Sequence, residues 1–95
     1  MSSIPSAKLR SALSAKGFRL DEAHHSLYWL VVGDKKRAIR TRVSHSLREY
    51  GDELLAQVAK QMRLRRRREL DEFVACPMSR EDYVKLLVGR GALEP

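Results

Sequence analysis

A chain of 95 residues has room for one hydrophobic core, so we expect a single domain. Hydrophobic residues make up 43% of the chain, which excludes wholesale disorder, and no apolar run reaches the roughly 20 residues that a membrane-spanning helix needs. The formal net charge of +7 is large for this length and favours a polyanionic partner.

The single cysteine, Cys76, cannot form an internal disulfide, which fits a reducing compartment. It has no metal-ligand spacing to other residues, and we expect it to be a small buried hydrophobic side chain. The N-terminal segment lacks the apolar core of a secretory signal. We therefore expect a cytoplasmic protein without a cofactor.

The first predicted element is a helix over residues 6–16. Pro5 suits a helix start, where its missing N–H is not needed, and Leu9, Ala12 and Leu13 recur at helical spacing. Gly17 supplies the stop. Residues 18–20 then alternate between apolar and basic and predict a short strand.

Two further strands are expected on either side of Gly33-Asp34, a typical hairpin turn sequence. A two-residue loop would place Trp29 opposite Ala38, whereas a three-residue loop would place it opposite Ile39. We prefer the three-residue loop because it gathers one apolar face. That face comprises Leu27, Trp29, Val31, Ile39 and Val43. Tyr28, Arg40 and Arg42 would then share the opposite face.

Three helices are predicted after a polar loop over residues 46–51. Asp52 is a good N-cap for a helix over residues 52–62, with Leu54, Leu55, Val58 and Met62 as its buried stripe. A second helix spans residues 66–75 and ends before Pro77. Ser79 and Asp82 resemble a capping box that opens the last helix, which ends near residues 89–91.

The predicted order of elements is α-β-β-β-α-α-α. A three-stranded antiparallel sheet with helices on one face makes this an α+β fold. The first five elements match the layout of double-stranded RNA-binding domains (dsRBD-like). We expect residues 6–64 to form that core and residues 65–95 to be a C-terminal helical extension.

Basic residues form two blocks. Residues 35–48 include six Lys or Arg and no acid. We assign five of them to phosphate contact: Lys35, Lys36, Arg37, Arg40 and Arg42. The second block, Arg63 and Arg65 to Arg68, is followed by Glu69, Asp71 and Glu72, which we expect to pair with it. Arg65 to Arg68 remain an alternative nucleic-acid patch.

Several motifs resemble those of the HicA family of small bacterial toxins, which are ribonucleases with a dsRBD-like fold. Lys16-Gly17-Phe18 matches the end of the family's first helix, His25 and Tyr28 fit its Gly-Ser-His-x-x-Tyr motif, and Gly33 fits the following turn. His45 stands six residues before Gly51, as the family's later histidine precedes Gly-Thr-Leu. The resemblance covers about residues 9–64. It departs from the pattern where Ala23-His24 replaces Gly-Ser and where Asp52 replaces Thr.

This resemblance implies metal-independent cleavage of mRNA that depends on His25. An imidazole that titrates near neutral pH can take the proton of a 2′-hydroxyl and protonate the leaving oxygen, while nearby cations stabilise the phosphate charge. His24 could be a second acid or base or a polar turn residue, and His45 could approach the site or bond the loop before the next helix. Tyr28 could stack on a base or pack against an arginine stem. The resemblance also implies an acidic antitoxin of the HicB type as partner.

Two other functions remain open. The same fold could be a non-catalytic RNA-binding module, or the chain could bind DNA through Arg65 to Arg68. Three histidines could suggest zinc, but no cysteine or carboxylate recurs at ligand spacing, so we expect no metal.

Overall fold

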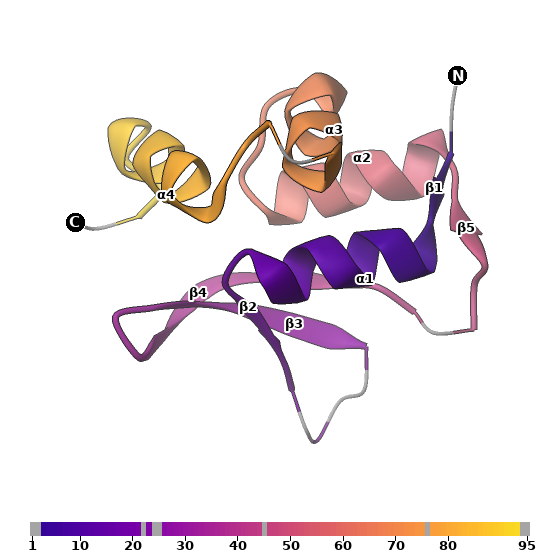
Figure 1. Cartoon of the computed structure of the whole chain (residues 1–95), viewed down its shortest axis with the longest axis horizontal. Coiled ribbons are helices and arrows are strands. Elements are labelled where there is room, and N and C mark those ends of the chain that lie inside the picture. The colour runs from indigo at the N-terminus through magenta and orange to yellow at the C-terminus, as the bar shows by residue number, and fades with distance from the viewer. Residues whose placement is uncertain (1–2, 22, 24–25, 45, 76, 94–95) are drawn as a thin grey trace.

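Short strands and helix α1 come first along the chain, and the remaining helices follow them (Figure 1). They are β1 (Ile4–Pro5), α1 (Ser6–Ala15), β2 (Phe18–Leu20), β3 (Leu27–Val32), β4 (Lys35–Arg42), β5 (Glu49–Tyr50), α2 (Asp52–Gln61), α3 (Arg67–Ala75) and α4 (Arg80–Gly89). The computed structural model describes residues 3–21, 23, 26–44, 46–75 and 77–93.

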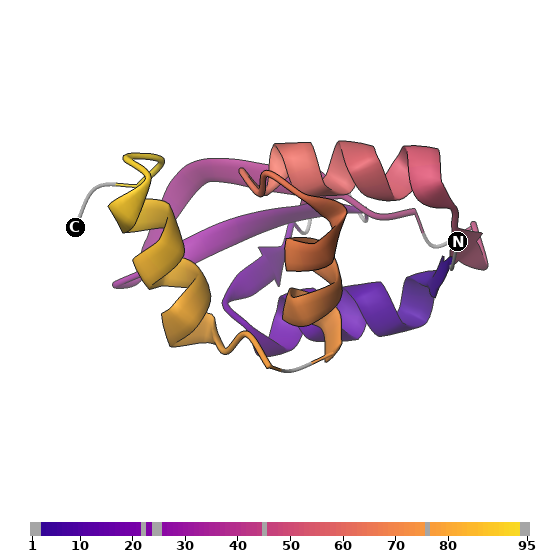
Figure 2. The same cartoon turned by 90° about the horizontal axis from the view of Figure 1, so that it is seen from above.

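The predicted α+β arrangement is confirmed. Strands β2, β3 and β4 form an antiparallel sheet in that order, and the helices lie on one of its faces (Figure 1). Seen from above, α3 lies between α1 and α2, and α4 lies toward the end of the sheet that carries the β3–β4 turn (Figure 2). None of the helices in the described part of the chain is long and apolar enough to cross a membrane.

The helices begin and end close to their predicted limits because their apolar periodicity is regular. The capping box of α4 is confirmed: Ser79 Oγ accepts from the Asp82 N–H, and Asp82 Oδ2 accepts from the Ser79 N–H, both at 3.1 Å. The prediction that Asp52 caps α2 is wrong. Gly51 holds the N-cap position, and Asp52 is the first helical residue, where its charge still complements the helix dipole. Leu54, predicted to be buried, is exposed.

A second, two-stranded sheet was not predicted. In it, Ile4 pairs with Tyr50 across β1 and β5, and the Ser6 N–H donates to the Arg48 carbonyl at 2.8 Å. Tyr50 is buried, and its hydroxyl accepts from the Ser44 N–H at 2.6 Å. The polar segment before α2 is therefore partly ordered as a strand, which ties the N-terminus to the start of α2.

The hairpin register predicted for β3 and β4 is wrong. Gly33 and Asp34 both adopt positive φ angles, 61° and 62°, as a two-residue type I′ turn requires, so Val32 lies opposite Lys35. The register then shifts at a bulge, and Trp29 pairs with Arg40.

This register reverses the two faces of β3. Tyr28 and Leu30 point into the core, 3% and 0% exposed, together with Ile39 and Val43 of the β4 side. Trp29 is only half-buried and lies opposite the exposed Arg40. An expected core residue thus faces outward, and an expected surface tyrosine is buried.

The core continues without interruption into the C-terminal helices. Phe18 of β2, Phe73 of α3 and Tyr83 of α4 form an aromatic cluster with ring centroids 5.1–6.2 Å apart. The Tyr83 hydroxyl donates to the Met62 carbonyl at 2.7 Å. Residues 65–95, expected to be an extension, therefore bury apolar side chains in the same core as the sheet.

Candidate nucleic-acid interface

The helices leave one face of the sheet uncovered (Figure 1). Trp29 lies on that face, because its neighbours Tyr28 and Leu30 point into the core on the other. Lys36 Nζ lies 4.8 Å from the centroid of its ring, and the guanidinium carbon of Arg40 lies 5.1 Å from it. Both distances allow cation–π attraction. The uncovered face therefore presents a half-buried aromatic ring with two cations close to it.

Asp21 fixes the orientation of the indole ring. Its Oδ2 accepts from Trp29 Nε1 at 3.0 Å, and its Oδ1 accepts from the Ala23 N–H at 2.8 Å. A hollow of about 640 Å³ lies beside this pair, lined by Arg19, Leu20, Asp21, Ala23, Trp29 and Lys36. Two cations, Arg19 and Lys36, outnumber the one carboxylate among the described residues of its lining.

Four of the five predicted phosphate-binding residues are exposed. Lys36, Arg40 and Arg42 surround the uncovered face, and Lys35 stands at the β3–β4 turn. Arg37 differs, because its Nη2 donates to the Val32 carbonyl at 3.2 Å. Its Nε is buried and has no hydrogen-bond partner among the described residues. The structure therefore groups Lys36, Arg40 and Arg42 but turns Arg37 toward the backbone.

Tyr28 does not share this face. Its ring is 3% exposed, and burial raises the pKa of its phenol, against an opposing effect of nearby Arg10. The predicted stacking of Tyr28 on a base is incompatible with this position. Trp29, which we had expected in the core, occupies the place suited to stacking.

The predicted catalytic residue His25 lies outside the described residues, as do His24, His45 and Cys76. The chain resumes at Ser26, whose carbonyl accepts from the Val43 N–H at 2.8 Å, and Leu27 lies opposite Arg42. The residue after His25 is thus held at the end of β4 that carries Arg40 and Arg42.

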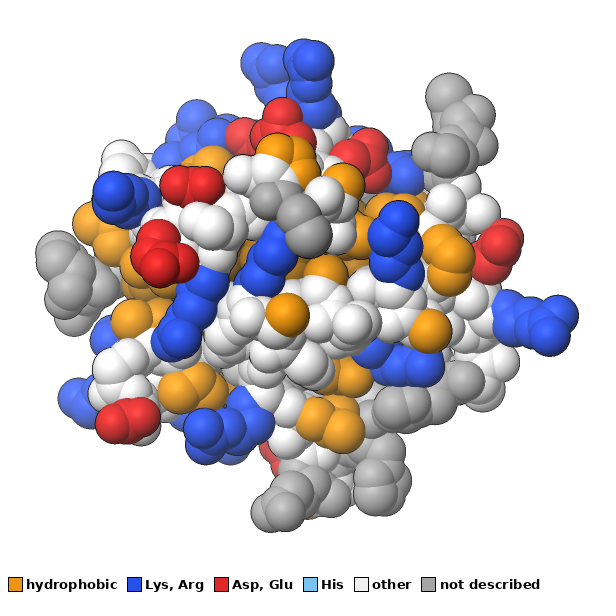
Figure 3. All heavy atoms as spheres, in the orientation of Figure 1, with side chains coloured by type: hydrophobic (Ala, Val, Ile, Leu, Met, Phe, Trp, Pro, Cys, Tyr) orange, Lys and Arg blue, Asp and Glu red, His pale blue; other side chains and the backbone are white. Residues whose placement is uncertain are grey.

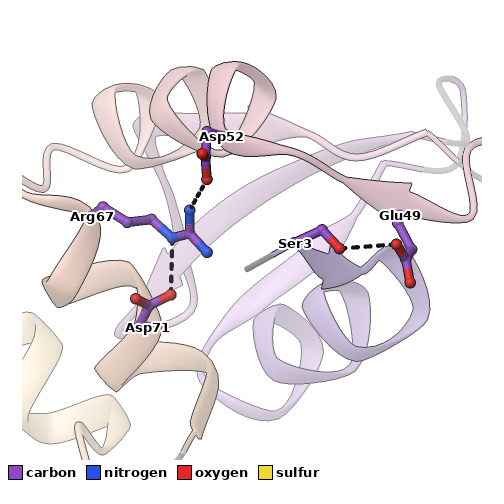
Figure 4. Close-up of polar contacts among 5 residues, drawn as sticks. All are labelled: Ser3, Glu49, Asp52, Arg67 and Asp71. Atoms are coloured by element: carbon purple, nitrogen blue, oxygen red, sulfur yellow. Dashed lines mark hydrogen bonds and ion pairs between the residues drawn. The ribbon is translucent and has the colours of Figure 1, made fainter. Parts of the chain in front are cut away.

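The second basic block is only partly paired as predicted. Arg67 binds Asp71, as expected, and also Asp52 at the start of α2, both at 2.9 Å (Figure 4). Glu69 instead forms two hydrogen bonds with Arg90 at the end of α4, at 2.5 and 3.0 Å. Arg65, Arg66 and Arg68 are exposed.

The helical side of the molecule carries both charge signs. In Figure 3, Lys and Arg side chains are spread over the face drawn, its middle included, and Asp and Glu side chains lie among them. Near the N-terminus, Ser3 Oγ donates a hydrogen bond to Glu49 Oε1 at 2.8 Å (Figure 4).

Sequence reasoning missed three residues that the structure places at or beside this face: Trp29, Gln61 and Arg63. The Gly33-Asp34 turn could have indicated the position of Trp29, because a two-residue loop places the indole on the same face of the sheet as Arg40. Nothing in the sequence places the end of α2 next to β4, where Gln61 Oε1 accepts from Thr41 Oγ1 at 2.7 Å.

Within the described part of the chain, no group of three or more His, Cys, Asp or Glu side chains is placed to hold a metal ion. No family model, curated protein or solved structure matches this chain.

Proposed function

We propose that this protein binds single-stranded RNA over the uncovered face of the sheet and cleaves it as a toxin-type endoribonuclease. The observation that carries the proposal is the half-buried Trp29 ring with Lys36 and Arg40 close to it on the uncovered sheet face. Proteins that read unpaired RNA stack its bases on aromatic side chains of a sheet and contact its phosphates with cations.

The cleavage step is assigned to His25, on the resemblance of residues 9–64 to the HicA ribonucleases. The neutral imidazole takes the proton of a ribose 2′-hydroxyl, and the oxygen attacks the adjacent phosphorus. The bond to the 5′-oxygen breaks, and that oxygen is protonated as it leaves. Arg40 and Arg42 are near the anchored Ser26 and stabilise the charge on the phosphate oxygens. No metal takes part in this proposal.

A ribonuclease acting on mRNA in the cytoplasm must be held inactive. The proposed partner is an acidic antitoxin of the HicB type that binds over the sheet face opposite the helices. Its negative charge would speed capture of a protein with a net charge of +7.

A non-catalytic RNA-binding module is the second candidate, because Trp29, Lys36 and Arg40 would hold RNA without any histidine. DNA binding through Arg65 to Arg68 is less favoured, since Arg67 is already engaged with Asp52 and Asp71.

Purified protein incubated with single-stranded RNA and a chelator tests the proposal. We expect cleavage by the parent protein and a loss of about 10²–10⁴-fold in rate for His25→Ala, the range for removing a general acid or base. RNA binding should survive in this variant, because the cations and Trp29 remain. Cleavage rates and fluorescence anisotropy measure the two properties separately.

Two matched variants act as controls. His24→Ala and His45→Ala should each cost less activity than His25→Ala, whereas replacing both Arg40 and Arg42 with Gln should weaken binding itself. Full activity in His25→Ala would contradict the mechanism. Binding without cleavage by the parent protein would favour the non-catalytic module.

A further inference from the structure

A second hollow, of about 430 Å³, lies between strand β4 and the end of helix α2. Three arginines line it, Arg40 and Arg42 from β4 and Arg63 from beyond α2. The remaining lining residues are Leu27, Ala38, Thr41 and Gln61. Among the described residues that line it there is no carboxylate, so three arginines border this hollow without an acid beside them.

Arg63 holds an unusual backbone position. Its φ is +65°, in the left-handed region that favours glycine, and it follows the C-cap of α2. The Leu64 N–H donates back to the Ala59 carbonyl at 2.8 Å, which closes the helix end as a Schellman motif. Glycine is the residue that this position favours, so an arginine here is held in strain.

Neutral donors complete the hollow. Gln61 Oε1 accepts from Thr41 Oγ1 at 2.7 Å and from the Arg42 N–H at 3.3 Å. These bonds hold the side-chain amide against the edge of β4, and the amide's NH₂ group adds a donor to those of the arginines. The lining is therefore rich in donors and positive charge, which suits a phosphate group.

We infer that this hollow seats a phosphate of the RNA backbone, with Arg63 as a phosphate-binding residue beside Arg40 and Arg42. The inference rests on the proposed RNA binding and extends it. Arg40 belongs to both sites: its guanidinium lies near the Trp29 ring, and the residue is also part of the lining of the hollow. A base stacked on Trp29 would thus have a phosphate of its own strand close to the hollow.

The test replaces Arg63 with glycine and measures binding of a 2′-O-methylated single-stranded RNA, which 2′-hydroxyl attack cannot cleave. Arg63→Gly should weaken binding about tenfold at low salt, as expected for one charge-assisted phosphate contact. The slope of log affinity against log salt should fall by about 1. The melting temperature should not fall, because glycine suits the left-handed position.

Two variants separate this role from backbone and charge effects. Asp34→Gly relieves the other left-handed non-glycine residue, with φ of 62°, and should not weaken binding. Arg68→Gln removes an exposed positive charge outside the hollow and should leave the salt slope within a few tenths of the parent value. If Arg63→Gly lowers the melting temperature, Arg63→Asn repeats the measurement with a residue that tolerates the same backbone.

RNA binding by the parent protein, with unchanged affinity and slope in Arg63→Gly, would overturn this inference and leave the proposed function standing. If the parent protein does not bind RNA, the proposed function fails, and titration with inorganic phosphate still tests the hollow. Shifts of the Arg40, Arg42 and Arg63 side-chain NMR signals that Arg63→Gly abolishes would then support an anion site. Their absence would overturn it.

Discussion

Lys16 is a buried cation that joins two parts of the chain. It is 8% exposed, and its Nζ donates to the carbonyls of Phe73 and Met78, the second at 2.8 Å. The ammonium also lies 5.2 Å from the centroid of the Phe73 ring. The Phe73 carbonyl is in the last turn of α3, where helical carbonyls lack a partner within the helix. Lys16 therefore caps α3 from the end of α1.

Replacing Lys16 with methionine keeps the apolar stem but leaves two carbonyls without this donor. We expect a loss of about 1–3 kcal/mol in the free energy of unfolding, the cost of leaving buried polar groups unsatisfied. Urea denaturation followed by circular dichroism measures it. Lys8→Met makes the same change on the exposed side of α1 and should alter stability by less than about 0.5 kcal/mol. Equal effects of the two substitutions would show that the buried contacts of Lys16 contribute nothing specific.

For single residues, the sequence predicted a role correctly where the residue acts on its near neighbours in the chain. The Ser79–Asp82 capping box is such a case, since both partners lie within one helical turn. The role of Lys16 could not be predicted from the sequence, because its hydrogen-bond acceptors lie 57 and 62 residues away along the chain. The positive φ of Arg63 was equally hidden, since nothing about an arginine indicates a left-handed backbone.

The contact between Glu69 and Arg90 fixes two helices relative to each other. Glu69 is in the first turn of α3, and Arg90 is the C-cap of α4. The Arg90 guanidinium, together with hydrogen bonds from the backbone of Arg65 and Arg66, lowers the pKa of Glu69 to about 2 from its ordinary 4.5. Both charges also complement the dipoles of their helices, the acid at an N-terminus and the arginine at a C-terminus.

This lowered pKa predicts how stability depends on pH. In the unfolded chain Glu69 binds a proton near pH 4.5, whereas in the folded protein it does so only near pH 2. The stabilisation is therefore fully present above about pH 4.5 and is lost as the pH falls toward 2. Arg90→Gln should be less stable than the parent at pH 7 and should lose less stability over this acid range. Urea midpoints measured from pH 7 to pH 2 check both effects.

Arg68→Gln is the matched control, because Arg68 is exposed and its removal leaves the Glu69–Arg90 contact in place. Its stability should follow the same pH dependence as the parent. Parallel curves for Arg90→Gln and the parent would mean that Arg90 does not set the pKa of Glu69.

The limits of helices were predictable, while pairing between elements was not. A regular 3.6-residue period marks α1, α2 and α3 within about one residue of their observed bounds. The register of β3 and β4 depends on the bulge between Trp29 and Val31, which no periodic pattern records. That bulge and the two-residue turn together decided which face of β3 is buried, and so which aromatic residue belongs to the candidate site.

The whole molecule is one core shared by the sheet and all four helices. Residues from both halves of the chain fill it, among them Leu9, Leu13, Phe18, Leu30, Leu55, Leu70, Phe73, Tyr83 and Leu87. The division into residues 6–64 and residues 65–95 came from the resemblance to shorter proteins. That resemblance did not predict that Phe18 of β2 packs against Phe73 and Tyr83, because packing between distant residues leaves no local sequence pattern.

A chain shortened to residues 1–64 tests this shared core. The buried apolar or aromatic side chains that it lacks include Leu70, Phe73, Val74, Tyr83 and Leu87. At about 1.5–3 kcal/mol for each, their burial contributes on the order of 10 kcal/mol, which matches the total stability of a typical small domain. We expect residues 1–64 alone to show no cooperative urea transition by circular dichroism and little dispersion of amide NMR signals. Adding residues 65–95 as a separate peptide should restore both, because the missing helices then complete the core. Cooperative unfolding of residues 1–64 alone would instead mean that the sheet, α1 and α2 form an independent unit.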